Sequence, residues 1–218
     1  IEWNEQQSMI RDMVRGYVEK EIVPQLDAIE YEGVPPYAIL RKMLQTFGID
    51  AMAKMEFDKQ IARDEARLRG DPVAEKTKKD GFNSAAADQA AMRMIPIIEL
   101  CRHAQGLVTA LGVSTGLAGG AIMSKGTLEQ KKRWALPLLT LEKVGAWAIS
   151  EPNSGSDLAS LRTSGKRVEG GWRVNGTKLW TTNAHRVHCM IALIRTAPAE
   201  EKNRQAGLTQ VLIPLDSP

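Results

Sequence analysis

Long apolar runs, cysteine and an excess of charge of one sign are all scarce in this sequence of 218 residues. The longest unbroken apolar runs, such as residues 190–194, fall far short of the roughly 20 residues of a membrane-spanning helix, so we expect no membrane span. The net charge is only +3, because 29 Lys and Arg are interleaved with 26 Asp and Glu. No basic tract alternates with aromatic residues, and we therefore expect no nucleic-acid partner.

Cysteine occurs twice, at Cys101 and Cys189, each among apolar neighbours. Two buried thiols are expected rather than a disulfide, which indicates a reducing compartment. His185 and His188 have no Cys, Asp or Glu nearby to complete a ligand set, so no metal site is expected. The N-terminal residues resemble neither a signal peptide nor an Arg-rich transit peptide. We expect a soluble, intracellular protein.

The first 140 residues carry helical periodicity. Apolar residues recur at steps of three and four from residue 5 to about 28, which predicts an amphipathic helix. A second helix is expected over residues 36–47, with Gly48 as its left-handed stop. Residues 54–80 are densely charged and predict a solvated helix or a mobile excursion.

Further helices are expected from residue 84 to about 136. Pro96 marks a bend in the first of them, and the small residues of segment 106–122 indicate closely packed helices. Thr127 and Gln130 form a capping box, in which each side chain bonds the backbone N–H of the other residue and starts a new helix.

The period changes from helix to strand near residue 140. Turn signals occur at Gly170-Gly171 and at Asn175-Gly176, the second a strong hairpin dipeptide. The strands that we expect cover residues 144–150, 178–183, 188–196 and 208–215. The fold class is therefore α+β: an N-terminal all-α helical bundle (1–140) followed by a small antiparallel β-barrel or Greek-key domain (141–218).

Two segments of this β-domain suit a flat polar ring. In residues 147–157 a strand ends at Pro152 and enters a loop of glycine and hydroxyl residues, whose free amides can bind a ring edge or a phosphate. In residues 178–183, Trp180 and Thr182 are two positions apart and would share one face of a strand. An indole and a hydroxyl on one face can stack on a ring and hydrogen-bond it.

Together these segments resemble the paired flavin-binding signatures of acyl-CoA dehydrogenases. The two signatures and two further blocks, in chain order and with fitting spacing, are Glu5-Gln6-x-x-Met9-Ile10-Arg11 through Pro24, Gly126-Thr127-x-Glu129-Gln130-Lys131, Glu151-Pro152-x-x-Gly155-Ser156-Asp157, and Asn175-Gly176-x-Lys178-x-Trp180-x-Thr182-Asn183. The first of these blocks is similar to the family's first helix, and the second to the helix start ahead of its β-domain. The resemblance covers most of the chain.

The resemblance implies FAD as the cofactor. It assigns the pyrimidine edge of the flavin to the backbone of Ile149 and Ser150, and the neighbourhood of flavin N5 to the Thr182 hydroxyl. Glu151 is expected to shape a turn rather than to react. The residues expected to bind the cofactor are Trp147, Ile149, Ser150, Gly155, Ser156, Trp180 and Thr182, and Ser156 is also expected to bind substrate.

The implied activity is oxidation of an acyl-CoA thioester to the trans-2-enoyl-CoA, by α-proton abstraction and β-hydride transfer to FAD. Electrons would pass to an electron-transfer flavoprotein, and the assembly would be a homotetramer or a dimer of dimers. In the family a C-terminal helical domain carries the glutamate base. We expect that domain to be missing from this sequence, so no catalytic residue is assigned.

Two alternatives stay open. The same fold serves acyl-CoA oxidases and flavin monooxygenases, and some relatives are non-catalytic partner subunits of mixed oligomers. The expected location is the bacterial cytoplasm, or the mitochondrial matrix of a eukaryote. The sequence also departs from the family pattern: Trp147 is larger than the usual residue, Ser150 often is Thr, and Ala184 stands where glycine is usual.

Overall fold

The computed structural model describes residues 2–72 and 84–217, and its chain divides into two compact units, Ile1–Leu111 and Gly112–Pro218. The sequence predicts a domain boundary at residue 140. Helix does give way to strand there, but residues 112–140 cluster with the sheet because the helical segment η3 (Val113–Gly119) packs on the first strand. The two units are described separately.

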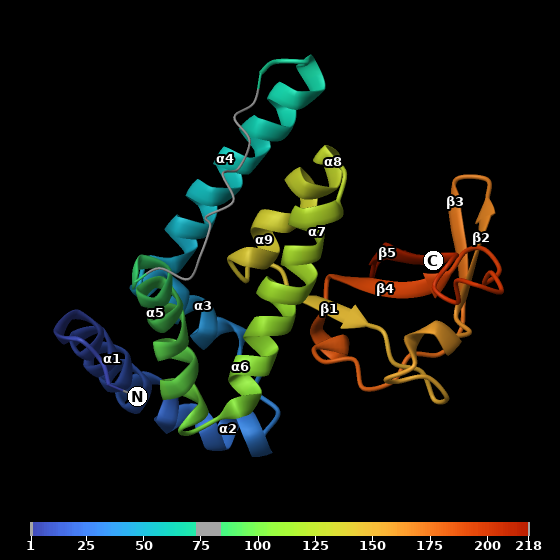
Figure 1. Ribbon diagram of the computed structural model, residues 1–218. Coiled ribbons are helices and arrows are strands. Elements are labelled where there is room, and N and C mark those ends of the chain that lie inside the picture. Colours follow the sequence, from blue (N-terminus) through green and yellow to red (C-terminus); the bar gives the residue numbers. More distant parts are fainter. Residues whose placement is uncertain (1, 73–83, 218) are drawn as a thin grey trace. The chain divides into compact units, whose positions relative to one another are not determined.

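The first unit is helical, as the periodicity predicted (Figure 1). Asn4 begins the first helix with a capping box, and Gly48, at φ 65°, separates two helices as expected. Helices α1 and α5 pack together, and Arg15 donates two hydrogen bonds to the buried carboxylate of Glu99. The segments are α1 Glu5–Tyr17, η1 Val18–Ile22, η2 Val23–Gln25, α2 Leu26–Tyr31, α3 Tyr37–Thr46, α4 Ile49–Arg69, α5 Ser84–Cys101 and α6 Gln105–Gly112, where η denotes a π- or 3₁₀-helix.

The charged stretch 54–80 begins inside helix α4. Most side chains of residues 54–69 are exposed or half-buried, and only Phe57 and Ile61 are buried, which agrees with the expected solvated helix. Residues 73–80, the last part of that stretch, lie outside the described residues.

Helical segments of the second unit lead from residue 112 to residue 139. The predicted capping box at Thr127 is confirmed, with Gln130 N–H donating to Thr127 Oγ1 and Thr127 N–H donating to Gln130 Oε1. The segments are η3 Val113–Gly119, α7 Gly120–Lys125, α8 Leu128–Gln130, η4 Lys131–Ala135 and α9 Leu136–Leu139.

Helical residues 105–125 form the one run, in the described part of the chain, that is long and apolar enough to cross a membrane. Its mean hydropathy reaches 1.5 over the most apolar window, although Gly, Ser and Thr interrupt the apolar residues. Length and composition alone are weak grounds, because the core helix of a soluble protein passes the same test. Ser114, Ala118 and Gly119 of this run are buried against protein.

The sheet of the second unit is mixed, not the antiparallel barrel or Greek key that we expected. Strand β4 is its centre: β5 pairs antiparallel with it along one edge, while β1 runs parallel on the other. The β2–β3 hairpin joins that second edge only through Ser164 and Arg195, again in parallel (Figure 1). The strands are β1 Gly145–Ala148, β2 Ser164–Val168, β3 Gly171–Asn175, β4 Cys189–Arg195 and β5 Leu208–Pro214.

One of the two predicted turns forms. Gly170, at φ 80°, lies in the turn that joins β2 to β3. Asn175-Gly176 forms no hairpin, because Asn175 stays in β3 opposite Ser164 and does not take the left-handed conformation that the tight turn requires. The chain then continues irregularly, so the strand expected over residues 178–183 is wrong.

Both cysteines are free thiols, as predicted. Cys189 begins β4 and is buried, and burial raises the pKa of its thiol to about 11. Cys101, at the end of α5, is half-buried. No residue of β4 is exposed, in agreement with the continuous apolar run that predicted a strand shielded on both faces.

Candidate functional site

An open hollow of about 320 Å³ lies in the second unit, between the helical segment η3 and the chain that follows β1. Five of the seven residues expected at the cofactor site line it. Three further apolar residues, which the sequence analysis missed, complete the wall. The lining residues are Val113, Leu117, Trp147, Ile149, Ser150, Leu179, Trp180 and Thr182.

Trp180 is the most conspicuous residue of this hollow. Its side chain is 91% exposed, and its φ of 55° is in the left-handed region, where a bulky residue is rare and strained. Because its indole is apolar and exposed and its backbone is strained, Trp180 is typical of a residue that a ligand or partner covers. Figure 1 shows no strand in this part of the chain, so Trp180 and Thr182 reach the hollow from an irregular segment rather than from one strand face.

Asn183 anchors the end of that irregular segment. It also takes a left-handed conformation, at φ 71°, and is 6% exposed. Its Nδ2 donates a hydrogen bond of 3.1 Å to the carbonyl oxygen of Gly145, in β1. The position of Thr182 is thus tied to the strand that supplies Trp147.

Ser150 and Thr182 bring donor groups to the hollow that have no protein partner. Within residues 2–72 and 84–217, neither the amide nor the hydroxyl of Ser150 forms a hydrogen bond as a donor, and the Thr182 hydroxyl likewise has none. The indole Nε1 of Trp147 is buried without a hydrogen-bond partner. A buried donor without a partner is costly, so these groups favour a ligand that accepts hydrogen bonds. The neighbouring indoles favour a planar ring, and a planar ring with polar edges meets both conditions.

A buried ion pair joins the residues that follow Ser150 and precede Leu179 in the chain, and the sequence analysis missed it. Lys178 Nζ lies 2.8 Å from Glu151 Oε1, and their side chains are only 11% and 6% exposed. Glu151 also accepts hydrogen bonds from the backbone N–H groups of Arg162, at 2.6 Å, and Thr163, at 2.9 Å. Both residues stand inside the quoted motifs, but no rule of spacing predicts that they meet.

The electrostatics of Glu151 follow from these contacts. Burial alone would raise the pKa of its carboxyl, but the hydrogen bonds from Lys178, Thr163 and Arg162 outweigh burial and lower that pKa from 4.5 to about 2. Glu151 is therefore an anion held by three donors, which suits the expected structural role at the turn and makes it a poor proton acceptor.

Gly155 and Ser156 do not reach the hollow. They are exposed on the loop between β1 and the 3₁₀-helix Leu158–Ser160 (η5). The neighbouring Ser154 is buried, and its hydroxyl donates to the backbone oxygen of Asp157 at 2.8 Å. Of the seven expected residues, these two are the ones that the structure leaves apart from the others.

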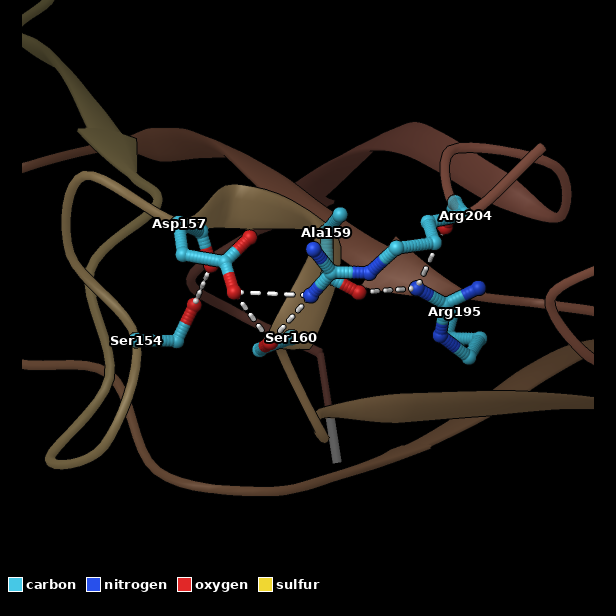
Figure 2. Close-up of polar contacts among 6 residues, drawn as sticks. All are labelled: Ser154, Asp157, Ala159, Ser160, Arg195 and Arg204. Atoms are coloured by element: carbon cyan, nitrogen blue, oxygen red, sulfur yellow. Dashed lines mark hydrogen bonds and ion pairs between the residues drawn. The ribbon is translucent and has the colours of Figure 1, made fainter. Parts of the chain in front are cut away.

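A polar network holds the far end of this loop (Figure 2). Arg204 donates to Asp157 Oδ2 at 2.7 Å and to Ser160 Oγ at 2.8 Å, while Ser160 Oγ donates to the same carboxylate. Hydrogen bonds from Ser160 and Arg204 lower the pKa of Asp157. Arg195, in β4, donates to the backbone oxygen of Ala159 at 2.8 Å, so the connection between β4 and β5 clasps the loop.

Of the two neighbouring histidines, His188 contacts the backbone. His188 Nδ1 accepts a hydrogen bond from the backbone N–H of Val144 at 3.0 Å. Among the described residues, no group of three or more His, Cys, Asp and Glu side chains could hold a metal ion.

Comparison with known proteins identifies the family. Residues 146–218 match the model of the acyl-CoA dehydrogenase middle domain. Acyl-CoA dehydrogenase AFT10-1 of Alternaria alternata is 32% identical over 215 residues, and the mitochondrial short-chain specific acyl-CoA dehydrogenase of Mus musculus is 26% identical over 218 residues. These alignments cover 98% and 100% of this chain but 46% of each relative, so the chain spans about half the length of the curated relatives it matches.

Solved structures agree with this match. The crystal structure of acyl-CoA dehydrogenase from Geobacillus kaustophilus superimposes with a TM-score of 0.71 at 25% identity, over 99% of this chain and 50% of that one. A glutaryl-CoA dehydrogenase from Mycobacterium smegmatis, solved in complex with FADH2, shares the fold with a TM-score of 0.65 at 21% identity, over 99% of this chain and 47% of that one. The α+β architecture, the order of the motif blocks and these likenesses together show that the chain belongs to the acyl-CoA dehydrogenase family.

Proposed function

We propose that this chain is the flavin-holding part of an FAD-dependent acyl-CoA dehydrogenase, which oxidises an acyl-CoA thioester to the trans-2-enoyl-CoA. One observation carries the proposal beyond family membership: the strand end at residues 147–150 and the irregular segment at 179–182 meet at one hollow. Both segments supply unpaired donors there, and Trp180 supplies an exposed indole.

FAD would supply the acceptor for the hydride that leaves the substrate's β-carbon. The indole of Trp180 would cover one part of the flavin ring system and exclude water from it. The amide and hydroxyl of Ser150, next to the backbone of Ile149, would hydrogen-bond the pyrimidine edge. Such donors stabilise negative charge that develops on a ring, because they are already oriented toward it.

Thr182 and Trp147 complete the proposed ring site. The Thr182 hydroxyl would lie near N5, and Trp147 would line the flavin and acyl pocket. Gly155 and Ser156 would contact the flavin pyrophosphate from the exposed loop, and Ser156 would also border the pantetheine of the substrate. Their exposure leaves them accessible to an extended ligand.

No residue of this chain is proposed as the base that removes the substrate's α-proton. Glu151 is unsuited to that task, because three hydrogen bonds hold its pKa near 2. The electrons would leave through an electron-transfer flavoprotein, and the protein would act as a homotetramer or a dimer of dimers. We place it in the bacterial cytoplasm, or in the mitochondrial matrix if it is eukaryotic; its relatives include a Bacillus subtilis enzyme and mitochondrial ones.

The test is flavin content and turnover of the full-length protein. We expect the purified protein to show flavin absorption and to reduce an artificial electron acceptor with an acyl-CoA. Trp180→Ala combined with Thr182→Ala should lose most of the flavin, whereas Trp172→Ala, on the exposed strand β3, should keep it. Unchanged flavin content and turnover in the double variant would refute the assignment, and oxygen consumption during turnover would indicate an oxidase or monooxygenase instead.

A further inference from the structure

The ammonium group of Lys178 has two partners. It lies 2.8 Å from Glu151 Oε1 and donates to the backbone carbonyl oxygen of Ile149 at 2.9 Å. The side chain of Lys178 is 11% exposed, so this contact with a peptide carbonyl is shielded from water and electrostatically strong. A lysine that only closed an ion pair would not need the Ile149 carbonyl.

These contacts join the two walls of the hollow. The backbone N–H of Leu179 donates to the carbonyl oxygen of Ser150 at 2.9 Å, next to the bond between Lys178 and Ile149. Glu151 in turn is fixed by the amides of Arg162 and Thr163. Residues 149–151 and 178–179 are therefore held together by the lysine, its carboxylate partner and a backbone bond.

The contact between Lys178 and the Ile149 carbonyl also determines which way the Ser150 N–H points. The described chain has no cis peptide bond, and in a trans peptide the carbonyl of one residue and the N–H of the next point to opposite sides. With the Ile149 carbonyl turned toward Lys178, the Ser150 N–H is turned away from it. No described residue accepts a hydrogen bond from this N–H, and Ser150 lines the hollow.

We propose that Lys178 is a positioning residue, whose ammonium orients and polarises the peptide between Ile149 and Ser150 so that the Ser150 N–H is presented to the flavin ring edge. Glu151 holds the ammonium in place. This inference rests on the proposed function. An ammonium on the carbonyl side draws electron density through the peptide and strengthens its N–H as a donor. The stronger donor favours the ring form with more negative charge, which is the reduced flavin.

The two charges of the pair should therefore act in opposite directions. Lys178→Met removes the cation and leaves Glu151 as an anion near the site, which disfavours a reduced, negatively charged ring. Glu151→Gln keeps the cation on the Ile149 carbonyl and removes the anion. If the ion pair merely held the two segments together, removal of either partner should shift the reduction potential of the flavin in the same direction.

The experiment compares reduction potentials and FAD affinities in full-length protein reconstituted with FAD. For Lys178→Met we expect a tenfold or larger fall in the ratio of affinities for reduced and oxidised flavin, which for a two-electron couple is a midpoint potential lower by about 30 mV. The dissociation constant of oxidised FAD, from fluorescence quenching on titration of the apoprotein, should also rise. Glu151→Gln should leave the midpoint potential equal to or higher than that of the wild type.

A third variant separates folding from positioning. Lys178→Met combined with Glu151→Gln leaves no lone buried charge, so it should recover thermal stability that Lys178→Met loses. Its midpoint potential should lie below that of Glu151→Gln, because the ammonium on the Ile149 carbonyl is still missing. Equal potentials in these two variants, or equal falls in both single variants, would overturn the inference. A wild-type protein that binds no flavin would overturn the proposed function itself.

Discussion

Ser114, fully buried in the helical segment η3, accepts at Oγ a hydrogen bond of 3.0 Å from the backbone N–H of Gly145, the first residue of β1. Residues 112–116 read Gly-x-Ser-x-Gly, a pattern known from nucleophile elbows. An elbow exposes its serine at a sharp turn from strand to helix, whereas this serine is 0% exposed inside a helix. Ser114 therefore joins a helix to the strand that carries Trp147.

Removal of that hydroxyl should destabilise the second unit. Ser114→Ala leaves the Gly145 N–H buried without a partner, and we expect a loss of about 1–3 kcal/mol in the free energy of unfolding, measured by urea denaturation. Ser124→Ala, at an exposed position of α7, is the matched control and should change stability by less than about 0.5 kcal/mol. Equal effects of the two substitutions would contradict the structural role.

The close approach of helix and strand at Gly145 gives a second prediction. A Cβ at this position would lie 2.8 Å from the Cβ of Ala118 and 3.1 Å from Leu138 Cδ2, both in the buried core. Gly145→Ala should cost about 1–3 kcal/mol through overpacking. Gly116→Ala, where a Cβ on the exposed helix face meets nothing within 4 Å, should be neutral or stabilising. Thermal unfolding of both variants checks the order.

Glu151 predicts a dependence of stability on pH. Its pKa is about 2 in the folded protein and 4.5 as the ordinary value, so the unfolded chain takes up the proton first. The stabilisation, about 3 kcal/mol from this shift, is fully present above pH 4.5 and is lost as the pH falls toward 2. The free energy of unfolding, measured with urea, should be well above that of Glu151→Gln in the wild type at pH 7. This difference in free energy should narrow between pH 5 and pH 3.

The control for this pH dependence is Glu169→Gln, in the exposed turn between β2 and β3. It should alter stability by less than about 0.5 kcal/mol at each pH. If the difference in unfolding free energy between wild type and Glu151→Gln stays constant from pH 7 to pH 3, the Glu151 carboxylate does not have the predicted lowered pKa.

The hydrogen bonds that hold the loop after β1 predict that two arginines contribute differently to its stability. Arg195 is half-buried and donates to the backbone oxygens of Ala159 and Ala206, whereas Arg204 pairs with Asp157 at the surface. Arg195→Met should therefore speed amide hydrogen exchange in residues 151–160 strongly and cost about 1–3 kcal/mol. Arg204→Met should have the smaller effect on both, because exposed ion pairs contribute little.

Arg186→Met serves as the control for both arginines, since Arg186 is exposed in the 3₁₀-helix Ala184–Arg186 (η6). We expect its exchange rates in residues 151–160 to match the wild type. Faster amide exchange in residues 151–160 with Arg204→Met than with Arg195→Met would show that Arg204, not Arg195, contributes more to holding this loop.

Local signals in the sequence predicted much of the helical unit and single turns. The capping box at Thr127, the left-handed Gly48 and the buried strand around Ile191 all formed, because each depends on residues close together in the chain. The failures were non-local. Asn175-Gly176 carries a hairpin signal, yet Asn175 remains paired with Ser164, and a Cβ at Gly176 would collide with Thr163.

The sequence by itself determined the family, the change from helices to strands near residue 140, and the two segments that supply the candidate site, since motif, period and turn chemistry depend on neighbouring residues. Only the tertiary structure decided that β1 and β4 run parallel, that Trp180 stands exposed in a left-handed conformation, and that Lys178 reaches both Glu151 and Ile149. The strand pairing and the lysine contacts arise between residues 27 to 44 positions apart, and no pattern of neighbouring residues encodes which distant groups will share one buried space.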